Sequence, residues 1–288
     1  MGTRARDDCL LHVLRAPDLA VTKESGAAWH RGDWDALYAR RPDHYPLPMP
    51  SLALAFEDFV PVLLTAFGLL LIVRMIRRVD PGAGAWAALG AVLVVAGGLS
   101  RASWKLVMAA GGPDLVPLFL ALYVLLATGY LLLVMALWRG WQAANGRRAR
   151  VPTWAAAAVA IAVLLPLTAV MAPAGGRIPP LLWLFTATSA SVITALLLAR
   201  WARAIGRPGL GWLFVVSMVV TLLLNGLARA ETQSEALQWA EQLLNTLNQA
   251  AFLLGAILLE RATRGAPADP ARTRAEVTPA PAMGTPES

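Results

Sequence analysis

The sequence offers almost nothing that could ligate a transition metal or carry redox chemistry. Cys9 is its single cysteine, which excludes an intrachain disulfide and a thiolate metal site. The three histidines, His12, His30 and His44, all precede the first apolar segment. An intramembrane zinc hydrolase needs ligands such as histidine within its helices, and a bis-histidine haem site needs two histidines there. The sequence therefore predicts no metal centre and no bound cofactor.

Other catalytic signals are missing as well. Lys105 is the single lysine of the apolar segments, so the last segment lacks the lysine that a retinal Schiff base needs. The glycine-rich stretch 82–90 follows a short basic loop instead of a strand, which is the wrong context for a nucleotide-binding loop. Within the apolar segments, only carboxylates and Lys105 could act as a base to activate a serine. The sequence favours a non-enzymatic role without excluding catalysis.

Charge is scarce, and apolar residues are abundant. Charged residues make up 15% of the chain and hydrophobic ones 57%, whereas a soluble domain carries about 25% charged residues. The apolar residues gather in segments of about 20, the length that crosses about 30 Å of hydrocarbon. No alternating pattern indicates an outer-membrane barrel. The sequence predicts an all-α, polytopic protein of the plasma membrane, of the bacterial inner-membrane type, with seven helices at about 52–76, 84–108, 115–138, 153–172, 180–203, 210–229 and 236–260.

Arginines fall in alternate loops and so predict the orientation. They follow the first, third, fifth and seventh apolar segments, and cationic loops stay in the cytoplasm. The N-terminus is therefore expected outside and the C-terminus inside. The basic net charge then reflects membrane topology, so we expect no nucleic-acid partner. The arginines concerned are Arg74, Arg77 and Arg78; Arg139, Arg147, Arg148 and Arg150; Arg200, Arg203 and Arg207; and Arg261 and Arg264.

The chain divides into three regions. Residues 1–48 contain seven acidic and seven basic residues without a helical period. They form either an extracytoplasmic arm or a stretch upstream of a true start at Met49, which we slightly favour because apolar sequence follows at once. Residues 49–264 form the transmembrane domain. Residues 265–288 are rich in Pro, Ala and Thr and are expected to be a disordered cytoplasmic tail.

Two stretches suggest an internal repeat. "LLLIVRMIRRVDPGAG" (69–84) and "LLLARWARAIGRPGLG" (196–211) share the triple Leu, the Pro-Gly and the final Gly at one offset. "GGLSRAS" (97–103) is similar to "NGLARAE" (225–231). These matches predict two parallel three-helix units separated by one inverting helix, an arrangement known in transporters. The alternative is chance similarity between Leu-rich helices with basic loops.

Polar residues concentrate in the seventh segment and near the outer ends of the first, second and sixth. Polar groups in a membrane are costly and need partners. Those of the seventh segment fall within an arc of about 120° at helical periodicity. We expect the acids to pair with the cations and the asparagines to form the floor of a cavity. The candidate residues are Glu57, Asp58, Arg101, Lys105, Asn225, Arg229, Glu241, Gln242, Asn245, Asn248 and Gln249.

Structural explanations compete with a functional one. Long cations near helix ends reach the headgroups without any function, and amides can simply join helices. A polar arc of this size on the seventh segment favours a ligand-binding site over purely structural contacts. The sequence predicts binding or transport of an unidentified small molecule through an outward-facing cavity among the first, second, sixth and seventh helices. The alternatives are a seven-helix sensor or accessory subunit with a cytoplasmic protein partner, and a lipid-interacting structural protein. A homo-oligomer is compatible with each alternative.

Overall fold

The computed structural model describes residues 51–146, 158, 161–162, 178–227 and 235–264 of the chain. These residues contain helices and no strand, which confirms the all-α class. Five stretches are long and apolar enough to span a membrane, which supports a membrane-embedded protein. The helices are α4 (Leu52–Glu57), α5 (Phe59–Val79), α6 (Pro81–Ala109), α7 (Val116–Ala144), α9 (Ile178–Ala204), α10 (Pro208–Leu227) and α11 (Glu235–Arg264).

The ends of the predicted segments lie within six residues of the ends of these helices. The exceptions are the first segment, which is divided into α4 and α5, and the fourth. The five long stretches are Leu52–Val79, Pro81–Ala109, Pro117–Ala144, Leu182–Ala204 and Ala236–Arg264, and Pro208–Leu224 is a shorter apolar helix. Nearly all of the predicted segment 153–172 lies outside the described residues, as do the arm and the tail. The count of seven therefore remains a prediction.

The first predicted segment is divided at Asp58 into α4 and α5. Pro61 explains this break, because it has no N–H to donate to the carbonyl of Glu57, four residues earlier, and its ring crowds that carbonyl. The hydroxyl of Ser51 accepts from the N–H of Leu54 at 3.4 Å and caps α4. Asp58 keeps helical backbone angles (φ −57°, ψ −23°), so the junction is a local interruption at which two adjacent carboxylates, Glu57 and Asp58, lie.

A single residue connects α5 to α6. Asp80 is the N-cap of α6, and its Oδ1 accepts from the N–H of Ala83 at 2.9 Å. Pro81 follows at the first helical position, where its missing N–H costs nothing. Gly84 lets the two helices meet closely, because a Cβ there would lie 2.7 Å from the Cα of Arg77. We call the end of the bundle with this connection and the α9–α10 connection the hairpin end.

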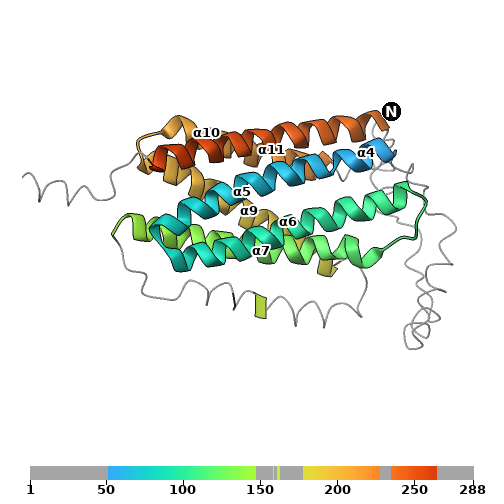
Figure 1. Ribbon diagram of the computed structural model, residues 1–288. Helices are drawn as coiled ribbons and strands as arrows, with labels where there is room; N and C mark the ends of the chain where they lie inside the picture. Colours follow the sequence, from blue (N-terminus) through green and yellow to red (C-terminus); the bar gives the residue numbers. More distant parts are fainter. Residues whose placement is uncertain (1–50, 147–157, 159–160, 163–177, 228–234, 265–288) are drawn as a thin grey trace, which may run out of the picture. The chain divides into compact units, whose positions relative to one another are not determined.

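Each helix packs against the next, in the order α5, α6, α7, α9, α10 and α11, and α11 returns to α5 (Figure 1). α6 and α7 meet most closely at Gly90 and Gly129, where a Cβ on either would lie 2.7 Å from the other's carbonyl oxygen. α7 and α9 run in the same direction, since Trp201 contacts Gly140 near the C-terminal end of both.

The apolar core lies in the half of the bundle nearest the hairpin end. It takes residues from the C-terminal halves of α5, α7, α9 and α11 and from the N-terminal halves of α6 and α10. Its fully buried members include Leu69, Ile72, Ile76, Ala83, Ala87, Leu133, Leu137, Leu198, Phe214 and Leu259. The opposite half, which we call the polar end, contains most of the predicted site residues.

Candidate functional site

Asp58 joins three helices at the polar end. Its side chain is only 10% exposed, and its Oδ2 lies 2.6 Å from the Nζ of Lys105, near the end of α6. Its Oδ1 accepts a hydrogen bond from the Nε2 of Gln242 on α11. A buried carboxylate is costly unless it is paired and hydrogen-bonded. The break at the α4–α5 junction, the last turns of α6 and the polar face of α11 are therefore linked through one carboxylate.

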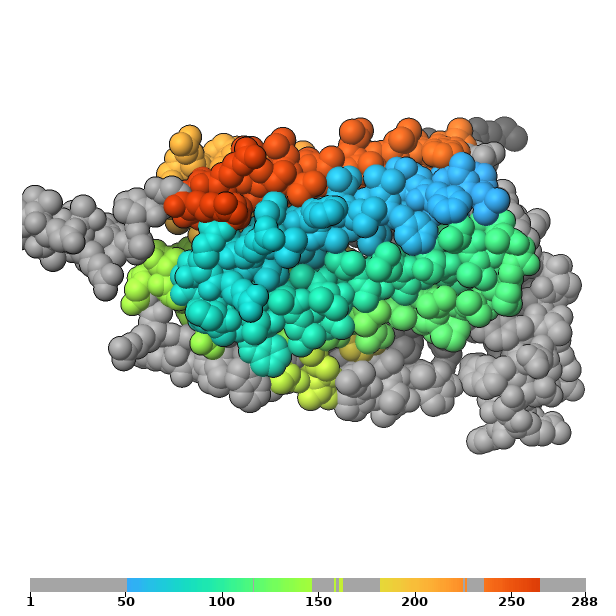
Figure 2. All heavy atoms as spheres, viewed as in Figure 1, coloured from blue at the N-terminus to red at the C-terminus, as the bar shows by residue number. Residues whose placement is uncertain are grey.

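Two further contacts continue this network along α11. The Oγ1 of Thr246 donates to the Oε1 of Glu57 at 2.7 Å. The Oγ1 of Thr65, on α5, lies 3.0 Å from the Oε1 of Gln249 and 2.8 Å from the carbonyl of Pro61. Residues 242, 246 and 249 are spaced to share one helical face, and α11 lies along α4 and α5 in the space-filling view (Figure 2). That face carries polar contacts from the polar end to about the middle of α11.

Asn248 extends the network to α10. Its Nδ2 donates to the Oγ1 of Thr221 at 3.0 Å, and the Thr221 hydroxyl donates to the carbonyl of Ser217 at 2.9 Å. Since the hydroxyl hydrogen is already used, Thr221 can only accept from Asn248, which fixes the orientation of the amide. Asn248 is 5% exposed, and its Oδ1 is buried without a hydrogen-bond partner among the described residues.

Glu241 provides a second buried acceptor. Its Oε1 also lacks a hydrogen-bond partner in the described part of the chain, and its charge lies within electrostatic range of the Lys105 ammonium. Buried polar atoms in folded proteins are normally paired with protein or with ordered water. Two unpaired acceptors, Glu241 Oε1 and Asn248 Oδ1, therefore call for hydrogen-bond donors that the described residues do not provide.

Phenylalanines lie directly below the network, toward the hairpin end. Phe252 is one turn beyond Asn248 on α11, and its ring meets that of Phe214 on α10 edge to face at 6.1 Å between centroids. Gly68 makes room for Phe252, because a Cβ at Gly68 would lie 2.6 Å from its Cε1. The described part of the network therefore ends on an aromatic floor, with Asn248, one of the asparagines predicted to form the floor, one turn above Phe252.

Of the predicted pairs between the acids and the cations Arg101, Lys105 and Arg229, the described residues contain one, between Asp58 and Lys105. Arg101 is half-buried and lies within electrostatic range of Lys105, but no described carboxylate forms an ion pair with it. Lys105, the cation that pairs with Asp58, lies one turn nearer the end of α6 than Arg101 does. Asn245 is half-buried and makes no hydrogen bond to a described side chain. The side chain of Asn225 and all of Arg229 lie outside the described residues.

Sequence reasoning missed a second charged cluster, at the hairpin end. The side chain of Glu260 is 3% exposed. It forms ion pairs with Arg78 of α5 and with Arg264, and the Nε of Arg264 lies 2.7 Å from the Oε1 of Glu260. The arginines serve in the sequence analysis only as signals of orientation. The i,i+4 spacing of Glu260 and Arg264 is the signal that could have identified this pair.

Asp80 forms the other ion pair of the hairpin end. Its Oδ2 lies 2.6 Å from the Nε of Arg139 on α7. Burial raises the pKa of the Asp80 carboxyl, but the Ala83 N–H and the Arg139 guanidinium outweigh burial and hold that pKa below its ordinary value. Asp80 is therefore both a helix cap and a link between α6 and α7.

The polar network has the chemistry of a hydrogen-bonding site. It combines carboxylate and amide oxygens with one ammonium group, and the described residues contain no group of three His, Cys, Asp or Glu that could hold a metal. The described contacts join these side chains directly, so the outward-facing cavity remains a prediction. Comparison with family models, curated proteins and solved structures finds no match for this chain.

Proposed function

We propose that this protein is a seven-helix protein of the plasma membrane that binds a small polar molecule entering from the extracytoplasmic side. In this orientation the polar end faces outward and the hairpin end lies in the cytoplasm. The basic residues of the hairpin end support that orientation, because cations are retained on the cytoplasmic side. They include Arg74, Arg77, Arg78, Arg139, Arg200 and Arg203.

The direction of the helices supports a seventh span and the repeat. Because α7 and α9 run in parallel, the end of α7 at Ala144 and the start of α9 at Ile178 lie at opposite ends of the bundle. A single span over the apolar stretch 153–172 would make that crossing. The two hairpins are also alike, since Pro81 begins α6 and Pro208 begins α10. Two parallel units, α5–α7 and α9–α11, with one inverting helix between them account for these features.

The observation that carries the proposal is the pair of unpaired acceptors, Glu241 Oε1 and Asn248 Oδ1, on the polar face of α11. A buried acceptor without a donor costs about 1–3 kcal/mol, so a ligand that supplies N–H or O–H groups recovers this cost. Asn248 lies near the middle of α11, the depth at which many carriers bind their substrates. A small solute rich in hydrogen-bond donors is therefore the favoured ligand.

The apolar core below the network bears on transport. Phe214, Phe252 and the buried aliphatic residues beyond them separate the network from the hairpin end. A bound solute would therefore stop at mid-membrane in this conformation. Release to the cytoplasm would require the core to open, as in alternating access, whereas a sensor would need no such opening.

Thermal shift of the purified protein against a panel of polar metabolites tests binding. We expect at least one solute to stabilise the wild type, and the stabilisation to disappear in Thr221→Val, which removes the acceptor that positions Asn248. Thr194→Val is the matched control, because the Thr194 hydroxyl also donates to a carbonyl four residues earlier but lies in the apolar half. Stabilisation lost equally in both variants would argue against this site.

Uptake of that solute into proteoliposomes then separates the two versions of the proposal. A carrier accumulates the solute inside the vesicles, whereas a sensor binds it without uptake.

A further inference from the structure

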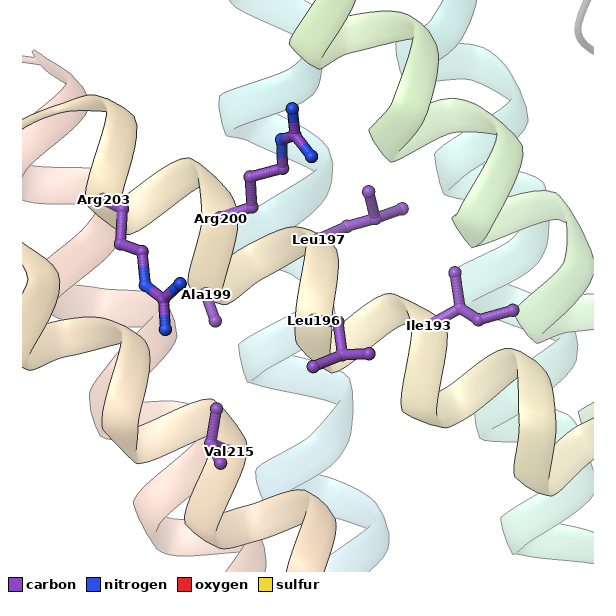
Figure 3. A pocket seen from close by; sticks show the side chains of 7 residues that line it. All are labelled: Ile193, Leu196, Leu197, Ala199, Arg200, Arg203 and Val215. Atoms are coloured by element: carbon purple, nitrogen blue, oxygen red, sulfur yellow. The ribbon is translucent and has the colours of Figure 1, made fainter.

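A groove separate from the polar network opens between α9 and α10. Its volume is about 290 Å³, and five apolar side chains and two arginines line it (Figure 3). α9 supplies all of them except Val215, which belongs to α10. Arg200 and Arg203 lie at one end of the groove and Ile193 at the other (Figure 3). The cations are therefore at the hairpin end, and the apolar walls extend toward the middle of the bundle.

The walls of the groove are suited to an acyl chain. Leu196 is 48% exposed and Ile193 45% exposed, so both are open to whatever surrounds the helices. The distance along α9 from residue 200 to residue 193 is about 10 Å at 1.5 Å per residue. That is about a third of the hydrocarbon thickness. In a membrane, such an apolar groove is filled by a lipid tail in preference to water.

The two arginines are available to an anion. Arg200 lies over the ring of Trp141, 4.4 Å from its centroid, and Trp141 stacks on Trp138. This cation–π contact uses the face of the guanidinium and leaves N–H groups at its edge free to donate. Among the described carboxylates, none forms an ion pair with Arg200 or Arg203. The hairpin end of the groove is therefore positively charged and lacks a counter-ion in the described part of the chain.

We propose that this groove binds an anionic phospholipid. Its phosphate is held by Arg203, with Arg200 adding positive charge at the same end of the groove, and one acyl chain lies along Val215 and Leu196 toward Ile193 (Figure 3). The charge of the groove and the apolarity of its walls match the two parts of such a lipid. Basic sites between helices on the cytoplasmic side bind anionic headgroups in this way. The proposal does not depend on solute binding at the polar end, because the two sites share no residue.

Lipid titration of the full-length protein in an uncharged detergent, followed by native mass spectrometry, tests this site. We expect dioleoyl-phosphatidylglycerol to bind more tightly than dioleoyl-phosphatidylcholine, which has the same chains but no net charge. An arginine near an anionic surface contributes about fivefold in affinity. Replacing both, in Arg200→Gln/Arg203→Gln, should therefore weaken phosphatidylglycerol binding about 25-fold.

Two matched controls locate the effect. Arg74→Gln/Arg77→Gln removes the same charge from exposed positions at the hairpin end of α5 and should change binding less than about twofold, since these residues do not line the groove. Val215→Phe, which fills the groove, should weaken binding, whereas Val216→Phe, at a 54% exposed neighbour, should not. If the arginine variant does not fold, the two valine variants still test whether the lipid binds in the groove.

Three results would overturn the proposal. The first is equal binding of the two lipids to the wild type. The second is an equal loss of phosphatidylglycerol binding in a groove variant and in its matched control. The third is binding of glycerol phosphate, which has no acyl chains, as tightly as phosphatidylglycerol, because a site for the phosphate alone would not need the apolar groove.

Discussion

The Asp58–Lys105 pair links α6 to the α4–α5 junction, and a double-mutant cycle measures the strength of this link. Its side chains are 10% and 16% exposed. Removing one partner of a buried pair costs about 3–5 kcal/mol because the other charge stays buried and unpaired. We therefore expect Asp58→Asn and Lys105→Gln each to lower the free energy of unfolding by about 3 kcal/mol. The double variant should recover most of one of these losses, since it leaves no uncompensated charge.

The assay is unfolding in mixed micelles by titration with sodium dodecyl sulfate. The matched control is the Asp80–Arg139 pair, which has nearly the same N–O distance, 2.6 Å, but side chains 15% and 33% exposed. More solvent screens this pair, so its coupling energy should be about 1 kcal/mol or less. Additive losses in the Asp58–Lys105 cycle, or single variants that cost less than about 0.5 kcal/mol, would refute the reasoning that this charge pair is buried.

Three further predictions follow from other contacts. Gly68→Ala should lower the free energy of unfolding by about 1–3 kcal/mol, because its Cβ would overlap the ring of Phe252. Gly226→Ala, with open space around it, should be neutral or stabilising by up to about 1 kcal/mol. Equal effects of the two substitutions would contradict the close approach of Gly68 to Phe252. The lowered pKa of Asp80 means that its contribution to stability is present above about pH 4 and is lost as pH falls through the folded-state pKa. Asp80→Asn, which keeps the cap, should thus show a smaller loss of melting temperature below about pH 4 than the wild type, and parallel curves would show that Asp80 adds no pH dependence. Glu260→Gln should lower the free energy of unfolding, measured in the same mixed micelles, by about 2 kcal/mol. An unchanged free energy would show that the Glu260 carboxylate does not stabilise the protein through Arg78 and Arg264.

The helices could be predicted closely from the sequence, because hydropathy and length determine what can cross a membrane. The predicted 236–260 and the observed Glu235–Arg264 differ by only a few residues. The break at Asp58 was not predicted, although Pro61 and its missing N–H are visible in the sequence. The consequence of a proline in a membrane helix depends on what neighbouring helices supply to the freed carbonyl, and the sequence does not contain that information.

The sequence indicates which polar side chains could meet at the polar end, but it does not determine which partner each of them takes. Gln242, Asn248 and Gln249 of the polar arc of α11 form hydrogen bonds to other helices, and the binding site that they are predicted to form stays a prediction. The partner of each acid depends on where α6 and α11 lie beside the α4–α5 junction, and periodicity cannot give that position. Thr246 was missed because a single threonine is common on apolar helices, although its spacing from Gln242 places it on the same face.

Cysteine accessibility tests the central claim most directly, namely that a polar route from the outside ends on the aromatic floor at Phe252. In a Cys9→Ser background, single cysteines at positions 246, 249, 252 and 256 of α11 are treated in intact cells with a membrane-impermeant, cationic methanethiosulfonate reagent. Positions 246 and 249 face polar groups of α4 and α5, whereas 252 and 256 pack against or within the apolar core. The account predicts labelling of the first two from outside and none of the last two. Labelling of all four, of none, or only from the cytoplasmic side would contradict it.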